Sequence, residues 1–397
     1  MRSRRRAKLT ALLAGLGIGL SVAELLVHAL CDATEAVRVP HPTRGVVCVP
    51  DSSTLHRGEG RRQRLHYNGR GFRDGERTVP KPAGVFRIAV LGDSYVEAPQ
   101  VAREDRLTEK LEKYLNEHGG AYGRRVEVIN FGVSGYGTMQ ELQTLREEVW
   151  EYQPDLVIVA LLTGNDFQNN CRELRHDRGR PYLCVDGLGF RELVPGSGGG
   201  KIGWHGLIDY VRNASATYRL WRGVVAQLVE QRIRRQEAAF YGAPGDRTAV
   251  GFEAGLNAAV YLPPRDAAWE QAWVVTEELL RRVNTECVAH GVNFVLVVLS
   301  NGIQVHPDAS VRTRFAKSIG TASLLYPEER LTTAAGRDGY GIMCLAPELR
   351  KVAERDHVFL HGFENAELGF GHWNERGHAE AARVVGDFLT ARWQHVR

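Results

Sequence analysis

Short apolar runs alternate with amphipathic stretches over most of the chain beyond residue 84. The apolar runs lack the polar alternation of a half-exposed strand, and they are Phe86–Leu91, Val126–Phe131, Leu156–Leu162 and Asn293–Leu299. The stretches with helical periodicity are Arg106–Glu117, Met139–Glu151, Ala267–His290 and Asn374–Arg392. Continuous apolar strands separated by helices are typical of a parallel sheet that is covered on both faces. The pattern therefore predicts a doubly wound α/β domain.

The apolar run over residues 9–30 differs from the others in length, and few polar residues interrupt it. As a helix it would extend about 33 Å, enough to cross a bilayer. Five basic side chains precede it and few follow closely, which predicts a cytoplasmic N-terminus and an extracytoplasmic body. We expect a single-pass membrane anchor, with a cleaved signal sequence as the alternative.

Three segments follow from this pattern. Residues 1–30 are a basic tail and a transmembrane anchor or signal sequence. Residues 31–84 are rich in Pro, Gly, Arg and Asp, have little periodicity, and are interpreted as a linker and lead-in ending in "NGRGFRDGE". Residues 85–397 form the main domain, interrupted by an insertion at about 171–264. The insertion is either a surface element or a cap over a substrate site.

Composition narrows the choice of partners and cofactors. A hydrophobic fraction of 43%, a charged fraction of 25% and a net charge of +4 are ordinary for a globular protein. The arginine-rich stretch 57–64 lacks interleaved aromatic residues, so no nucleic-acid partner is expected. None of the six cysteines has the spacing of a metal or redox site, and no metal or other cofactor is expected. An exported body permits disulfides, and Cys171–Cys184 is the expected local pair.

Polar residues follow three of the predicted strands. Ser94 ends "VLGDS", Gly135 lies in "NFGVSG", and Asn165 lies in "TGND", while His372 precedes the last predicted helix in "HWNERGH". Ligands of doubly wound sheets bind beyond the carboxyl ends of the strands. Ser94 is the candidate nucleophile and His372 the candidate base, with His378 as a rival. The backbone N–H groups of Ser94 and Gly135 and the Asn165 amide are candidate donors to an oxyanion.

These four blocks, in this order, resemble the SGNH/GDSL hydrolase superfamily from about Arg87 to the C-terminus. The resemblance implies a flavodoxin-like three-layer αβα sandwich with a central parallel sheet. It also implies ester hydrolysis or acyl transfer without a metal. The lead-in and the N-terminal apolar run resemble a bacterial membrane-anchored subgroup.

One departure from the family pattern concerns the acid that orients the histidine. The family usually carries Asp two or three residues before the His, where this chain has Phe370 and Gly369. Glu364 is the candidate substitute and Glu367 a second one; a Ser-His dyad and an inactive protein remain alternatives.

The expected function is a serine-dependent ester hydrolase outside the cytoplasm, of the esterase, lipase or acetylhydrolase type. Its substrate is an acyl ester, with an acylated glycan or lipid among the options. The alternatives are an O-acyltransferase that modifies a glycan and a catalytically inactive binding module.

Overall fold

A five-stranded parallel sheet forms the centre of the protein. The computed structural model describes residues 2–30, 37–177, 179–187, 189–195, 215 and 256–394. The sheet has the order β11-β10-β7-β5-β6, and all its neighbouring pairs are parallel. Its strands are β5 (Val85–Gly92), β6 (Arg125–Asn130), β7 (Leu156–Leu162), β10 (Asn293–Leu299) and β11 (Gly341–Cys344). The predicted parallel sheet is confirmed; edge strand β11 was missed because its four half-buried residues leave no long apolar run.

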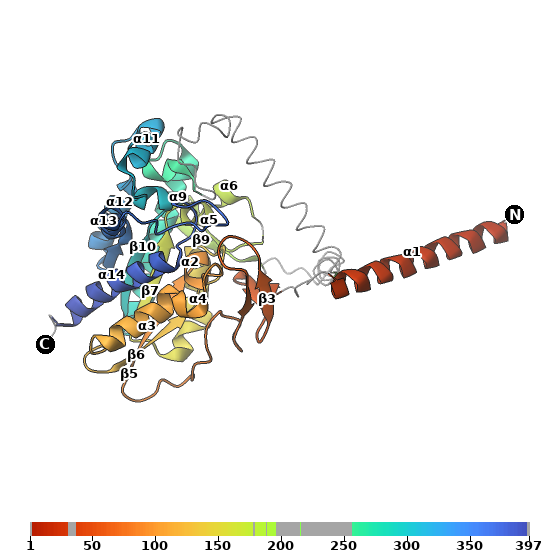
Figure 1. Ribbon diagram of the computed structural model, residues 1–397, viewed down its shortest axis with the longest axis horizontal. Helices are drawn as coiled ribbons and strands as arrows, with labels where there is room; N and C mark the ends of the chain where they lie inside the picture. The colour runs from red at the N-terminus through yellow and green to blue at the C-terminus, as the bar shows by residue number, and fades with distance from the viewer. Residues whose placement is uncertain are drawn as a thin grey trace.

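Two helical layers cover the sheet (Figure 1). Side chains of β5 alternate between two apolar cores: Ile88 and Val90 enter one, and Ala89 and Leu91 enter the other. The first core is closed by α3 (Leu107–Glu117), α13 (Leu345–Asp356) and α14 (Glu375–Gln394). The second is closed by α4 (Thr138–Glu147), α9 (Ala267–Ala289) and α12 (Tyr326–Asp338). Burial on both faces explains why these strands are apolar throughout.

The strand order creates a topological switch point between β5 and the central strand β7. The chain passes from β5 to β6 on one side of β5 and then to β7 on the other side. Loops that leave neighbouring strands in opposite directions create a switch point, where doubly wound proteins bind ligands. Ser94 and Asn165 follow β5 and β7 directly, so the topology puts both of them at this point.

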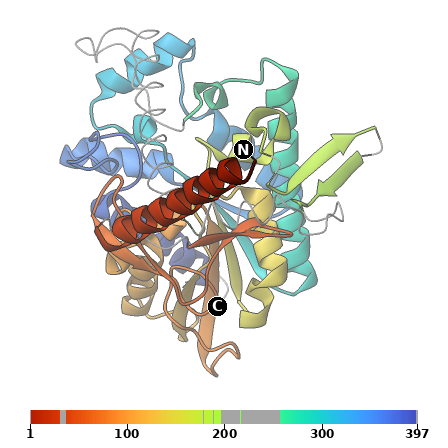
Figure 2. The same cartoon turned by 90° about the vertical axis from the view of Figure 1, so that its right-hand side faces the viewer.

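Shorter elements complete the body. They are α2 (Ser94–Glu97), η1 (Arg103–Asp105), η2 (Val149–Tyr152), α5 (Asp166–Asn170), α6 (Arg172–Arg175), β8 (Tyr182–Asp186), β9 (Gly189–Leu193), η4 (Ala258–Tyr261), α10 (Gly302–Val305) and α11 (Ala309–Ile319). Figure 2 shows β8 and β9 as a hairpin that projects from the body. Most of the predicted insertion, residues 196–214 and 216–255, lies outside the described residues.

The expected Cys171–Cys184 disulfide is absent, and both residues are free thiols. Cys171 is buried beside α9, where its thiol contacts the Ala268 carbonyl, whereas Cys184 lies half-buried on β8. The short sequence spacing therefore does not bring the two side chains together.

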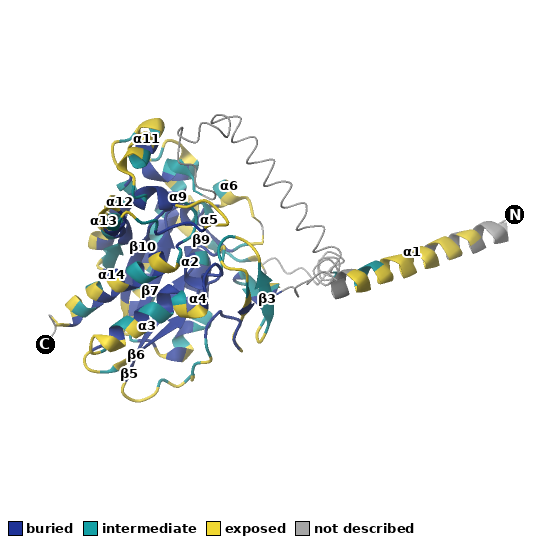
Figure 3. Cartoon of the chain, in the orientation of Figure 1, coloured by how far each residue is buried: buried dark blue, intermediate teal, exposed yellow. Residues whose placement is uncertain are grey.

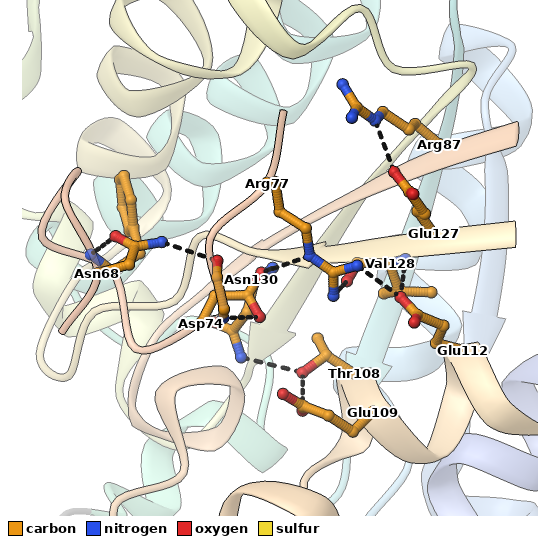
Figure 4. Close-up of polar contacts among 12 residues, drawn as sticks. Asn68, Asp74, Arg77, Arg87, Thr108, Glu109, Glu112, Glu127, Val128 and Asn130 are labelled. Atoms are coloured by element: carbon orange, nitrogen blue, oxygen red, sulfur yellow. Dashed lines mark hydrogen bonds and ion pairs between the residues drawn. The ribbon is translucent and has the colours of Figure 1, made fainter. Parts of the chain in front are cut away.

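Residues 37–84, called the lead-in segment below, pack on the sheet instead of forming a linker. They form two antiparallel hairpins, β1 (Arg38–His41) with β2 (Gly45–Cys48) and β3 (Ser53–His56) with β4 (Gln63–His66). Phe72 is buried, with its ring 5.0 Å from that of Phe131. Figure 4 shows the polar side of this packing, where Asp74 accepts a hydrogen bond from the Asn130 amide. The interpretation of this stretch as a linker is thus corrected.

The N-terminal residues form one helix, α1 (Arg2–Leu30). Figure 3 shows it exposed along most of its described length. Within the part of the chain that the structure describes, no helix combines the length and the apolar character needed to cross a membrane. The expectation of a transmembrane helix over residues 9–30 is therefore not supported.

Candidate active site

Ser94 stands at the sharp transition from β5 to α2. The side chain of Asp93 accepts a hydrogen bond from the Tyr95 amide at 2.9 Å, so Asp93 caps the short helix that Ser94 opens. Ser94 itself is half-buried, while the residues on either side of it are buried. The turn thereby holds the serine hydroxyl at the carboxyl end of β5, next to the switch point.

A chain of hydrogen bonds joins Ser94 to His372 and His372 to Glu59. The distance from Ser94 Oγ to His372 Nε2 is 2.8 Å, and that from His372 Nδ1 to Glu59 Oε2 is 2.7 Å. The His372 amide also donates to Glu59 Oε1 at 3.1 Å. Because a carboxylate only accepts, Nδ1 carries the imidazole proton and Nε2 is left to accept from the serine hydroxyl. This is the arrangement that activates a serine for nucleophilic attack.

The carboxylate beside His372 comes from the lead-in segment and not from Glu364. Glu364 and Glu367 are exposed, and neither side chain contacts His372 in the described structure. Asn365 instead holds the loop that carries Glu59, since it accepts from the Gly60 amide at 3.0 Å and donates to the Gly58 carbonyl at 3.2 Å. The acid that sequence reasoning sought beside the histidine is therefore supplied from 313 positions away.

Gly371 permits the close approach of Glu59. Its φ of 81° lies in the left-handed region, and a Cβ at this position would overlap Glu59 Oε1. Gly371 is thus required both for its backbone conformation and for the space that the carboxylate occupies. The sequence "HRGEGRRQR" around Glu59 gave no such signal, because a single acid among arginines reads as a solvated loop.

The loop that carries His372 is fixed by a buried network on its other side. The Gly371 carbonyl accepts from His361 Nδ1 at 2.7 Å and from the Tyr95 hydroxyl at 2.8 Å. His361 Nε2 lies 2.9 Å from Ser300 Oγ. Burial lowers the pKa of His361 to about 3, so this imidazole is neutral. Its neutral form donates to the carbonyl through Nδ1 and accepts from the serine through Nε2, which satisfies both nitrogens.

The other two candidate groups lie in the loops that follow the two strands beside β5. Gly135 follows β6; it is exposed and has a φ of 83°, so a side chain there would be strained. Asn165 follows β7, and its Nδ2 donates to Asp93 Oδ2 at 3.2 Å. Asp93 therefore ties the Asn165 amide to the turn that carries Ser94. The structure brings Ser94, Gly135 and Asn165 to adjacent strand ends, with Nδ2 of Asn165 keeping a second N–H for another acceptor.

Three buried acids lie beneath this arrangement. Burial raises the pKa of Asp93, which also accepts two hydrogen bonds. Burial and repulsion from neighbouring carboxyl groups raise the pKa of Glu141 and of Asp166 well above their ordinary values. Burial thus disfavours the charged form of each of these three carboxyl groups relative to the same group in water.

His378, the rival base, lies within helix α14 and does not contact Ser94. It is buried, and its Nδ1 accepts from the Leu107 amide at 3.2 Å. Burial lowers the pKa of His378 to about 3. His378 thus provides an acceptor for a backbone N–H in the first turn of α3, which has no acceptor within that helix. His372 is therefore the histidine that contacts the candidate nucleophile.

No protein-family model matches the chain, and no curated protein does either. Among solved structures, the chain is similar to the acetyl xylan esterase AlAXEase at 11% identity and a TM-score of 0.38, over 76% of this chain and 99% of that one. It is similar to a lipase/acylhydrolase from Enterococcus faecalis at 12% identity and a TM-score of 0.38, over 77% and 96%. A two-domain esterase active on acetylated mannans aligns at 10% identity and a TM-score of 0.39, over 78% of this chain and 50% of that one. With identities and TM-scores this low, a functional assignment rests on the geometry of the site.

Proposed function

We propose that the protein is a serine-dependent ester hydrolase that forms an acyl-enzyme at Ser94. The observation that carries this proposal is the hydrogen-bond chain from Ser94 through His372 to Glu59, with distances of 2.8 and 2.7 Å. Such a chain joins a nucleophile, a base and a group that orients the base, and it serves acyl transfer on unrelated folds. The alternative of an inactive binding module depended on the lack of an acid beside His372, and Glu59 provides a carboxylate there.

The residues divide the reaction as follows. Ser94 Oγ attacks the ester carbonyl while His372 Nε2 takes the hydroxyl proton. The Glu59 carboxylate holds the imidazole in the required tautomer and stabilises the imidazolium that forms. His372 then gives the proton to the departing alcohol, leaving Ser94 acylated. A water molecule, deprotonated by His372, attacks the acyl group, and the carboxylic acid leaves as Ser94 regains its proton.

The oxyanion formed in each step needs preorganised donors. Ser94 begins helix α2, so its N–H has no acceptor within the helix. The Gly135 N–H and the second N–H of the Asn165 side chain complete the proposed set. Each donor of this kind contributes roughly 3 kcal/mol of transition-state stabilisation.

The test measures hydrolysis of p-nitrophenyl acetate by the full chain and by Ser94→Ala. We expect turnover by the wild type with release of free acetate, and loss of turnover in the variant with an unchanged circular dichroism spectrum. A fluorophosphonate should label the wild type at Ser94, as identified by peptide mass spectrometry. Equal turnover by the two proteins, or labelling at another serine, would refute the proposal.

We also propose that the body acts outside the cytoplasm. The support is the basic residues that precede the apolar run over residues 9–30. Protease added to intact spheroplasts should digest the body while a cytoplasmic marker survives. A body that stays protected until the cells are lysed would contradict the proposal.

A further inference from the structure

The Gly135 N–H belongs to the same peptide unit as the Ser134 carbonyl. In a planar trans peptide the C=O and the N–H point in opposite directions. Any group that holds the Ser134 carbonyl therefore also sets the direction of the Gly135 N–H. Gly135 has no side chain with which to anchor itself, and it is exposed, with nothing within 4 Å of the position that a Cβ would take.

Arg38 holds this carbonyl. Its Nη1 donates to the Ser134 oxygen at 2.9 Å, and its Nη2 donates to Glu97 Oε2 at 3.1 Å. The same Glu97 oxygen accepts from the Ser134 amide at 2.5 Å. One ion pair thus holds Ser134 on both sides of its Cα, through the amide that precedes it and the carbonyl that follows it.

Glu97 links this loop to the nucleophile. It is the last residue of α2, the helix that Ser94 begins, and it is buried. Burial alone would raise the pKa of Glu97, but Arg38 and hydrogen bonds from Ser134 and Tyr67 hold the pKa below its ordinary value. The carboxylate is therefore charged, and its bonds to Arg38 and Ser134 are of the stronger, charge-assisted kind.

The next peptide unit is held in a similar way. Arg180, in the loop before β8, donates from Nη1 to the Gly135 carbonyl at 2.6 Å. The peptide units on both sides of Gly135 are thus fixed by guanidinium groups from different parts of the chain. Arg38 lies on β1 of the lead-in segment, which also supplies Glu59.

We propose that Arg38 is a positioning residue for the oxyanion hole, with its guanidinium aiming the Gly135 N–H at the carbonyl that Ser94 attacks. The proposal rests on the proposed ester hydrolase function. Glu97 is a second positioning residue, because its carboxylate binds both the Arg38 guanidinium and the Ser134 amide. The lead-in segment in this view completes both halves of the site, orienting the base through Glu59 and the oxyanion donor through Arg38.

The experiment compares Arg38→Met with Arg70→Met in the full chain. Arg70 is a matched control because it also belongs to the lead-in segment, pairs with the body through Glu148 and Glu151, and has a side chain 37% exposed against 39% for Arg38. Both variants lose an ion pair between the lead-in segment and the body. The Ser134–Gly135 peptide loses a contact only in Arg38→Met.

We expect Arg38→Met to lower kcat for p-nitrophenyl acetate by about 10- to 100-fold with KM little changed, since a misaimed donor weakens the transition state alone. The inhibition constant of an alkyl boronic acid, which forms a tetrahedral adduct on Ser94, should rise by the same factor. Arg70→Met should stay within about twofold of the wild type in both measurements.

Arg38→Met leaves the buried Glu97 without its counter-ion, which can prevent folding. A second variant is therefore included. Arg38→Lys retains the positive charge but cannot reproduce the two-pronged contact, so we expect an intermediate fall in kcat and in boronate affinity. If Arg38→Met does not fold, Arg38→Lys decides. Wild-type values in the folded Arg38 variants, or an equal loss in Arg70→Met, would overturn the inference. A wild type that neither hydrolyses the ester nor binds the boronate would instead overturn the proposed function.

Discussion

The strand-end loops of the sheet and the lead-in segment both meet at the candidate site, yet they differ in how they reach it. The loops that follow β5, β6 and β7 bring Ser94, Gly135 and Asn165 by backbone topology. The lead-in segment instead reaches the site through two long side chains, with Glu59 on His372 and Arg38 on the Ser134 carbonyl. The first region carries the candidate nucleophile and oxyanion donors, and the second contacts the candidate base and the peptide of one donor.

A segment with little hydrophobic periodicity can therefore supply contacts that orient the groups of a candidate site. Several contacts attach the lead-in segment to α2 and the loop that follows it. Arg73 donates to the Glu97 carbonyl at 2.8 Å, and the Gln63 side chain donates to the Val101 carbonyl at 2.6 Å. Because this anchoring is tight, Glu59 and Arg38 are held at fixed positions relative to Ser94.

The largest effect is expected when His372, the proposed base for Ser94, is removed. His372→Ala removes the proton acceptor for Ser94, so kcat for an activated ester should fall on the order of 10⁶-fold. His378→Ala is the control, because His378 is buried in α14 and does not contact Ser94. Its kcat per folded molecule, measured after active-site titration, should stay within a few-fold of the wild type. Activity retained in His372→Ala would end the serine-histidine mechanism.

The next largest effect is expected from a change of Glu59, which belongs to the lead-in segment. Glu59→Gln keeps the side-chain shape but loses the charge that fixes the His372 tautomer, so kcat should fall by roughly 10³- to 10⁴-fold. Glu364→Gln, an exposed change in the loop near His372, should leave kcat unchanged. Steady-state kinetics on one ester decide between them. A large loss in Glu364→Gln with little in Glu59→Gln would assign the acid to the loop that carries His372 and not to the lead-in segment.

A smaller effect is expected from a change of Asn165, which lies in the loop that follows β7. Asn165→Ala removes one oxyanion donor, and kcat should fall by about 10²- to 10³-fold with KM little changed. Asn165→Asp serves as a second variant, since it keeps the size but places an acceptor where a donor is required. A variant that raises KM and spares kcat would make Asn165 a substrate-binding residue instead.

The smallest effect concerns the stability of the body around the site. Burial lowers the pKa of His361 and of His378 to about 3, whereas an unfolded imidazole titrates near 6.5. Between these values the unfolded chain binds more protons, so stability is present above about pH 6.5 and is lost as the pH falls towards 3. From pH 7 to pH 5 each histidine should cost about 2 kcal/mol of unfolding free energy.

Urea unfolding at the two pH values measures this loss. The His361→Gln variant should show a shallower decline than the wild type, because one of the two buried imidazoles is gone. An identical decline in both proteins would show that His361 titrates alike in the folded and unfolded states.

The sequence by itself determined the parallel sheet, four of its five strands and the groups at their carboxyl ends. These features depend on local patterns: apolar runs that tolerate burial on both faces, and Gly, Ser and Asn where a strand turns into a loop. The strands β5, β7 and β10 begin or end within one residue of the predicted runs. The four blocks that resemble a known family lie on these same strand ends and on the loop before α14.

Only the tertiary structure decided which acid faces His372 and which residue holds the Gly135 peptide. A contact between Glu59 and His372 spans 313 positions, and one between Arg38 and Ser134 spans 96. Nothing in the periodicity of a loop records which distant partner its side chains will meet. Glutamate and arginine in a polar stretch have the same pattern whether they face water or a catalytic group, because the difference lies in the surface that folds against them. The fold therefore followed from local burial, whereas the orientation of the candidate catalytic groups followed from long-range packing.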